Sequence, residues 1–399
     1  MEGNVAWMLI STALVVFMVP GLALFYGGMV RSKNVLNMLN MNTYCLGIIP
    51  LLWVLFTFSL GNSGSGDGIG ALIGNFDVAG LKGITGDTDA IIGVVFSMTF
   101  AAITPALIAG AVADRMKFSA WAIFVPIWSI IVYTPVFYWV YVGWHHSKLD
   151  PAAIDFAGGT AIHINAGIAS LALVMVLGKR AGWPDQAMPP HNLPFVMLGA
   201  GILLFGWFGF NGGSAFAADG VAAQAVLNTF VAAAAGMIGW LAIEKFRDGH
   251  ATTLGGASGV VAGLVAITPA AGFVGGLSPI IFGFAASALC YYAIQLKTKY
   301  GYDDSLDVVG IHMVGGIVGG ILLGFFADAR IGGADGAFFG NGGLVLSQII
   351  AIVSVMAYSF VVTYVIAKVL DNMIGLRVSD ETEQTGLDQI EHAETAYAE

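Results

Sequence analysis

The chain has 399 residues, of which 57% are hydrophobic and only 10% are charged, whereas an average soluble domain is about 25% charged. This composition excludes an ordinary soluble protein and indicates a chain that lives in a lipid bilayer. The formal net charge of −10 comes mostly from residues 371–399, which hold eight acids and one Arg, so the acidity says nothing about a substrate.

Apolar runs of about 20 residues, long enough to cross roughly 30 Å of hydrocarbon, recur along almost the whole length. Because they show no period-2 alternation, they predict helices, which satisfy their own backbone groups in lipid. We expect an all-α polytopic membrane protein with a transmembrane domain over 1–370, followed by an acidic cytoplasmic tail over 371–399. The eleven predicted spans are 5–30, 38–61, 89–113, 118–142, 156–178, 192–217, 221–243, 253–272, 277–296, 305–327 and 342–369.

The distribution of Lys and Arg over the connecting loops predicts the orientation, because positive charge is retained in cytoplasmic loops. Twelve basic residues fall on one side of the predicted bundle, and Lys82, Lys148 and Arg330 fall on the other. The sequence therefore predicts an outside N-terminus and an inside C-terminus.

Three short similarities relate the first half of the chain to the second. "FYGG" (25–28) resembles "FNGG" (210–213), "ITPA" occurs at 103–106 and again at 267–270, and Asp155 with His163 resembles Asp307 with His312. Each pair lies five spans apart, and an odd offset reverses the direction through the membrane. The pattern indicates an inverted 5+5 repeat plus helix 11, with a site near the midplane; chance similarity in a Gly-rich chain is the alternative.

Two histidines fall inside predicted spans, where an ionisable group marks a functional site by default. They are His163 and His312; the other five (His145, His146, His191, His250 and His392) are expected to be solvated in loops, at a span end or in the tail. Two neutral imidazoles in matched positions of inverted halves could hydrogen-bond each other beside a narrow lumen. A satisfied packing role for each ring is the alternative.

Charged residues are absent from the middle of every predicted span. A conduit for a bare metal cation needs carboxylates or stacked carbonyls, so the lumen suits a small uncharged species. Cys45 and Cys290 lie inside spans and form neither a disulfide framework nor a metal-binding spacing. The sequence predicts no metal and no cofactor, although two in-span histidines also leave open a haem protein with axial His ligands.

Aromatic side chains accompany the histidines at helical spacing. Trp207, Phe210 and Ser214 share one helical face, and Phe96 and Phe100 lie one turn apart. Such stripes usually pack in a core. An outward-facing Trp beside a Ser hydroxyl would instead hold a small cation by cation–π attraction and a hydrogen bond.

Four segments carry a resemblance to a known family: "DFAGGTAIHINAG" (155–167), "GWFGFNGGS" (206–214), "SGVVAGLVAITPAAGF" (258–273) and "DVVGIHMVGG" (307–316). They resemble the signature segments of the ammonium transporter family (Amt/Mep/Rh), and the similarity extends over essentially the entire chain. It implies ammonium transport rather than enzymatic catalysis, in a multi-pass protein of the cell membrane. It also implies a homotrimer with one pore per subunit.

The resemblance assigns roles to particular residues. The family's twin pore histidines match His163 and His312, and its stacked phenylalanine gate matches Phe100 and Phe210. Its outer recruitment site matches Trp207 and Ser214, with Phe96 and Tyr141 alongside, and its supporting acid matches Asp155, which could also simply cap its helix.

Two positions depart from the family pattern. Tyr141 replaces the usual recruitment-site Trp, so either recruitment is looser or Trp144 substitutes for it. Met313 replaces the glycine that usually follows the second pore histidine, and it either crowds the lumen or faces a neighbouring helix.

The function implied is recruitment of NH₄⁺ outside, loss of a proton near the phenylalanine gate, and passage of NH₃ along the histidines. We expect the proton to cross as well, making transport electrogenic; a passive NH₃ gas channel and an ammonium sensor are the alternatives. Methylammonium is the expected analogue, and no nucleic acid partner is expected. The tail is disordered by composition, whereas the resemblance implies an ordered segment that contacts neighbouring subunits and a cytoplasmic PII-type signal protein.

Overall fold

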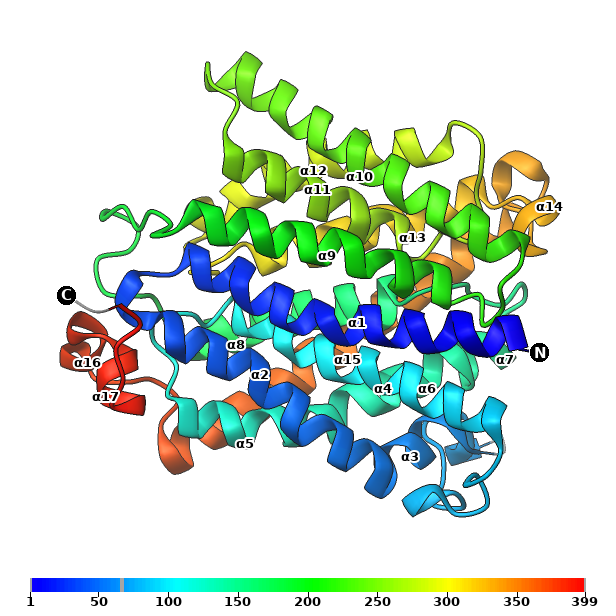
Figure 1. Cartoon of the computed structure of the whole chain (residues 1–399), viewed down its shortest axis with the longest axis horizontal. Helices are drawn as coiled ribbons and strands as arrows, with labels where there is room; N and C mark the ends of the chain where they lie inside the picture. The colour runs from blue at the N-terminus through cyan, green and yellow to red at the C-terminus, as the bar shows by residue number, and fades with distance from the viewer. Residues whose placement is uncertain (1, 65–67, 398–399) are drawn as a thin grey trace.

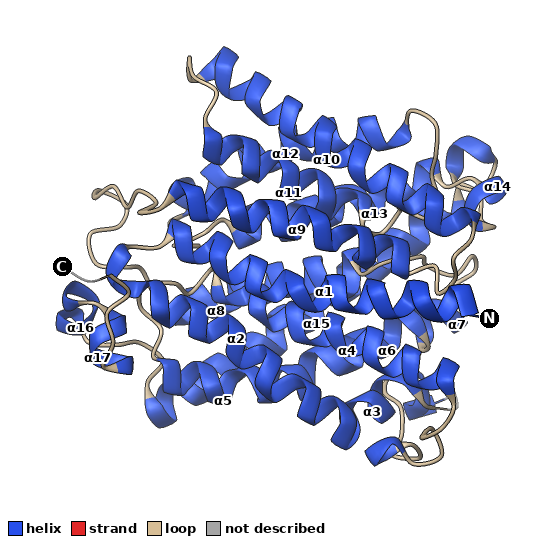
Figure 2. Ribbon diagram, in the orientation of Figure 1, coloured by secondary structure: helices blue, strands red, loops and turns tan. Residues whose placement is uncertain are grey.

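The computed structural model describes residues 2–64 and 68–397, and it is built from helices throughout that part of the chain (Figure 2). The longer helices run side by side as one bundle (Figure 1). The helix bounds are α1 Glu2–Met29, α2 Val35–Leu52, α3 Phe58–Asn62, α4 Thr88–Ala109, α5 Phe118–Trp128, α6 Thr134–Tyr141, α7 Trp144–Ser147, α8 Asn165–Leu177, α9 Leu193–Gly213, α10 Gly220–Arg247, α11 Thr253–Ile267, α12 Ser278–Tyr300, α13 Val314–Phe326, α14 Ala329–Gly332, α15 Gly343–Ile374, α16 Asp380–Thr385 and α17 Leu387–His392.

Ten helical segments of the described chain are long and apolar enough to cross a membrane. The eighth predicted span is the exception, because α11 has 15 residues and is only about 22 Å long at 1.5 Å per residue. Helical turns continue it through residues 268–273. The prediction of an all-helical polytopic fold is confirmed, with one span shorter than its apolar run.

Four π-helical turns interrupt these spans, at Trp53–Thr57, Ser129–Tyr133, Gly159–Ile164 and Val309–Met313. The last two carry His163 and His312 at the start of α8 and α13. Because π-turns are rare and concentrate at functional sites, this placement singles out the same two histidines as the sequence does.

The two ends of the bundle differ in the segments that lie there. The N-terminus and the C-terminus lie at opposite ends of the bundle (Figure 1), as an odd number of crossings requires. At the end that carries the N-terminus, the Ala218 amide donates to Asn4 at 3.0 Å. At the other end, the Ala181 amide donates to Glu383 of the tail at 2.7 Å.

The tail is ordered and packs against its own chain, contrary to the disorder that its composition predicts. Helix α15 continues to Ile374, four residues past the predicted boundary, and Arg377 then forms a β-bridge with Met116. Helices α16 and α17 follow, with Leu387 fully buried between the tail and the bundle. Burial of Leu387 and the backbone bridge at Arg377 therefore hold the tail in place despite its polar, acidic composition.

Candidate functional site

His163 and His312 meet inside the bundle. Their Nδ1 atoms lie 3.2 Å apart, the ring planes are 19° from parallel, and the side chains are 2% and 4% exposed. A hydrogen bond between two Nδ1 atoms needs one protonated and one unprotonated nitrogen. In this arrangement one ring therefore donates from Nδ1 and the other accepts at Nδ1.

Each histidine helix begins with an aspartate that caps it. Asp155 accepts from four successive backbone amides, those of residues 158–161, at 2.6–3.0 Å. Asp304 accepts from Val308 at 3.1 Å and from Val309 at 2.7 Å. Both aspartates lie eight residues before their histidine, so the inverted repeat is expressed in the capping of the two π-turns.

The sequence comparison of the two halves matched the wrong aspartate in the second half. Asp307 lies five residues before His312, has a left-handed backbone (φ 64°), and pairs with Lys297 at 2.6 Å. Asp304 occupies the position equivalent to Asp155. The spacing of eight residues between aspartate and histidine, visible in the sequence, distinguishes Asp304 from Asp307.

A vestibule of about 260 Å³ opens above the histidines, on the side of the bundle that carries the N-terminus. Its lining includes the predicted Phe96, Tyr141 and Ser214. Phe100, predicted as part of the gate, also lines it, and sequence reasoning missed the other lining residues that bear side chains: Asn62, Ser97, Phe137, Val142, Phe156 and Phe216. These come from five separate stretches of chain, so no local motif could have grouped them.

Two stacked rings separate the vestibule from the histidines. The centroids of Phe100 and Phe210 lie 4.3 Å apart with planes 19° from parallel; Phe100 lines the vestibule, and Phe210 lines the space around the histidines. That inner space has a volume of about 10 Å³, at the lower limit for one water molecule. The stacked rings thus lie between the vestibule and this inner space, which is mostly apolar.

Trp207 lies below the rings of Phe100 and Phe210, in the space around the histidines, and does not line the vestibule where the outer recruitment site was expected. Its ring stacks on His163 with centroids 5.4 Å apart, and its Nε1 donates to Thr268 at 2.8 Å. The helical spacing that puts Trp207 on one face with Ser214 also places it nearly two turns deeper. Trp207 therefore holds the His163 ring flat instead of facing the vestibule.

The two departures from the family pattern are resolved by geometry. Trp144 packs on His145 and Trp139 and does not line the vestibule, whereas Tyr141 does. Met313 lies so close to α8 that a Cβ on Gly167 would come within 2.5 Å of its backbone nitrogen. The Met313 Cβ would lie 2.6 Å from the same added carbon, and Met313 does not line the space around the histidines, so it faces α8.

His145 was expected to be solvated and is instead fully buried, with Nε2 2.9 Å from the Ser354 hydroxyl. It contributes to packing against Trp139, Trp144 and Ser354. No group of three or more His, Cys, Asp or Glu in the described ranges could hold a metal ion.

Comparisons with known proteins agree with this geometry. Residues 6–397 match the model of the Ammonium Transporter Family. The chain is 48% identical to an ammonium transporter of Mycobacterium tuberculosis over 99% of this chain and 90% of the relative, and 48% identical to one of Aquifex aeolicus over 99% and 93%. The structure of Saccharomyces cerevisiae Mep2 superposes with a TM-score of 0.88 at 32% identity, over 96% of this chain and 88% of that one. A sensor Amt protein superposes with a TM-score of 0.90 at 25% identity, over 98% of each chain.

Proposed function

Because the chain belongs to the ammonium transporter family, we propose that it carries ammonium across the cell membrane. The observation that supports this most directly is the buried His163–His312 pair beneath a closed phenylalanine gate. Burying a bare cation in such a space costs a large desolvation free energy. The site is therefore suited to NH₃, after NH₄⁺ has been collected and has lost a proton.

The route has three stages, each with its own residues. NH₄⁺ is held in the vestibule by the aromatic faces of Phe96 and Tyr141 and by the Ser214 oxygen. The proton leaves near the gate of Phe100 and Phe210, and opening of that gate admits NH₃. A cation that cannot release a proton, such as K⁺, cannot pass through these steps, so selectivity is chemical as well as steric.

The histidine pair provides a path for the proton. His163 Nε2 is buried and has no hydrogen-bond partner in the structure, so it is free to bond a passing molecule. The bond between the two Nδ1 atoms links this nitrogen's ring to His312. We propose that the proton crosses along this pair and that transport is electrogenic, with Asp155 holding the outer π-turn in place.

The experiment is a current measurement on proteoliposomes adsorbed to a solid-supported membrane. An ammonium jump gives a transient current in the native chain, and His163→Ala abolishes or strongly reduces it, while a K⁺ jump gives none. Ammonium uptake without charge displacement would reject the electrogenic version and favour a passive NH₃ gas channel. The absence of both uptake and current would leave a sensor that uses the same pore.

Topology and partners complete the proposal. The excess of Lys and Arg in one set of loops supports an outside N-terminus and a cytoplasmic C-terminus, with 1–370 as the ammonium transporter domain. The family resemblance supports a homotrimer and a PII-type signal protein that meets the inner face beside the tail. Mass measurement in mild detergent tests the first, and co-purification with and without the tail tests the second.

A further inference from the structure

Phe216 has a backbone conformation that a side chain of its size rarely adopts. Its φ is 54°, in the left-handed region that is usual for Gly and a genuine outlier for a bulky residue. It follows the last residue of α9 by three positions, and its amide donates to the Gly213 carbonyl at 2.9 Å. Glycine is the residue that this type of helix end normally takes.

The strained backbone places the Phe216 ring on the wall of the vestibule. The ring meets Phe96 edge to face, with centroids 5.4 Å apart and planes 81° from parallel. Phe96 in turn lies 4.9 Å from Phe100 of the gate. An unbroken series of aromatic contacts thus runs from the outer lip of the vestibule to the gate.

Exposure distinguishes Phe216 from the other aromatic side chains of the vestibule. It is 53% exposed, whereas Phe96, Phe100 and Phe137 are between 2% and 8% exposed, and Tyr141 and Phe156 are intermediate. Ser214, two residues before it, donates its hydroxyl proton to the Phe210 carbonyl at 2.8 Å. The Ser214 oxygen therefore keeps lone pairs that can accept from an N–H donor.

We propose that Phe216 is a substrate-binding residue that supplies the first aromatic surface met by an incoming ammonium or small alkylammonium ion. The ion sits against the Phe216 ring by cation–π attraction and donates a hydrogen bond to Ser214 before it reaches Phe96 and the gate. The left-handed backbone persists because it presents the ring to the vestibule, as strained residues at binding sites do. This inference rests on the proposed function.

The test measures transient current as a function of ammonium concentration for the native chain and for three variants. Phe216→Leu keeps the bulk and removes the π face, Phe216→Gly removes both the ring and the strain, and Phe216→Trp enlarges the π face. The control is Phe76→Leu, since Phe76 is 65% exposed in the loop before α4 and does not line the vestibule. Thermal unfolding is followed for every variant.

In Phe216→Leu and Phe216→Gly the half-saturating ammonium concentration should rise about two- to fivefold, the range expected for an exposed cation–π contact, and Phe216→Trp should match or improve on the native value. Phe216→Gly should also unfold at a higher temperature than the native chain, because glycine adopts this φ without strain. Gain of stability with loss of affinity is the signature of a binding role. Unchanged half-saturation in both the Leu and Gly variants would overturn the inference, whereas absence of any native ammonium current would overturn the proposed function itself.

Discussion

Asp303 and Asp304 are adjacent in the chain and differ in what they bind. The Asp303 carboxylate accepts hydrogen bonds from Arg180 Nε at 2.9 Å and Nη2 at 2.8 Å. The Asp304 carboxylate instead accepts from the backbone amides that begin the His312 turn. Burial alone would raise the pKa of Asp303, but Arg180 and Arg115 hold that pKa below its ordinary value. Burial, reinforced by the charge of Asp307 and opposed by Lys297, raises the pKa of Asp304 to about 6.

Asp303→Asn is expected to destabilise the protein at neutral pH. The substitution leaves the Arg180 guanidinium, 6% exposed, without its bidentate carboxylate, and breaking a buried pair from one side costs about 3–5 kcal/mol. Thermal unfolding in detergent at pH 7 measures the loss. An unfolding temperature equal to that of the native chain would show that Asp114, whose Oδ2 lies 3.7 Å from Arg180 Nη1, replaces Asp303.

Asp304→Asn is expected to behave differently and to depend on pH. Because the folded pKa of Asp304 lies above its unfolded value, the stability that this group contributes is fully present below about pH 4 and is lost as the pH rises through about 6. Asparagine does not ionise. The unfolding temperature of the variant relative to the native chain should therefore be higher at pH 8 than at pH 5, and the opposite order would contradict the assignment.

At the scale of helices, glycine decides how closely the spans approach one another. A Cβ added to Gly319 of α13 would lie 2.0 Å from the Ala266 carbonyl oxygen of α11, so the two backbones are in contact there. By contrast, a Cβ on Gly201 of α9 meets nothing within 4 Å. Small residues at contacts allow this close packing between membrane helices.

Gly319→Ala and Gly201→Ala form a matched pair. We expect Gly319→Ala to destabilise by about 1–3 kcal/mol through overpacking, because backbone atoms must move. Gly201→Ala should be neutral or stabilising by up to about 1 kcal/mol, since alanine favours the helix. Denaturation midpoints of the two variants in the same detergent give the comparison; equal effects would mean that α11 and α13 separate at little cost.

The sequence predicted the spans and the central rings because their signals are local. Long apolar runs identify helices, and two in-span histidines are rare enough to be recognised from position alone. The vestibule was harder to predict because its wall combines α4, α6 and the segments around Asn62, Phe156 and Phe216, and only packing brings these together. Trp207 shows the limit of helical spacing, which gave the correct face but not the depth relative to the gate.

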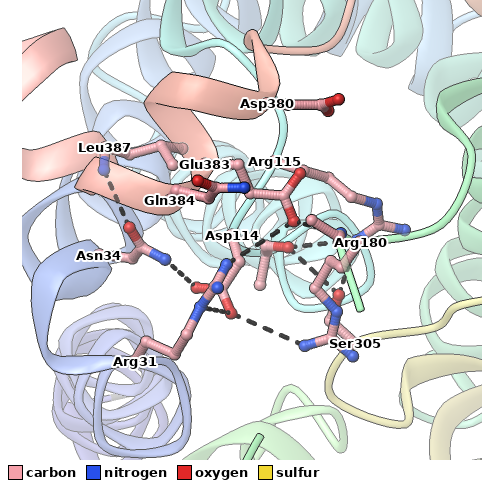
Figure 3. Close-up of polar contacts among 12 residues, drawn as sticks. Arg31, Asn34, Asp114, Arg115, Arg180, Ser305, Asp380, Glu383, Gln384 and Leu387 are labelled. Atoms are coloured by element: carbon pink, nitrogen blue, oxygen red, sulfur yellow. Dashed lines mark hydrogen bonds and ion pairs between the residues drawn. The ribbon is translucent and has the colours of Figure 1, made fainter. Parts of the chain in front are cut away.

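For the molecule as a whole, the tail acts as a structural part of the end of the bundle that carries the C-terminus. Glu383 is fully buried and binds Arg377 Nη2 at 2.7 Å and the Ala181 amide, and Arg31 lies nearby at 3.7 Å. Asn34 accepts a hydrogen bond from the Leu387 amide and donates one to Asp114 (Figure 3). The tail thus connects the loops that follow α1, α4 and α8.

Helix α2 depends on the tail for its N-terminal cap. Its own N-cap residue, Asn34, makes no side-chain cap hydrogen bond. Asp388 of α17 instead accepts from the amides of Leu36 at 3.0 Å and Asn37 at 2.8 Å. A carboxylate at the start of a helix satisfies free N–H groups and complements the helix dipole, and here it comes from a segment more than 350 residues later.

Deletion of the chain from residue 379 onward is therefore expected to lower stability and leave selectivity unchanged. It removes the cap on α2, for about 0.5–2 kcal/mol, and it exposes the apolar surface under Leu387 while leaving Arg31 without Glu383. The vestibule, the gate and the histidine pair lie among other residues, so the preference for ammonium over K⁺ should persist.

Asp388→Asn is the milder variant, because it keeps one acceptor oxygen for α2 and should lose less stability than the deletion. Unfolding temperatures and currents from ammonium and K⁺ jumps, taken on the same preparations, separate the two effects: altered selectivity in the deletion would mean that the docked tail shapes the pore itself.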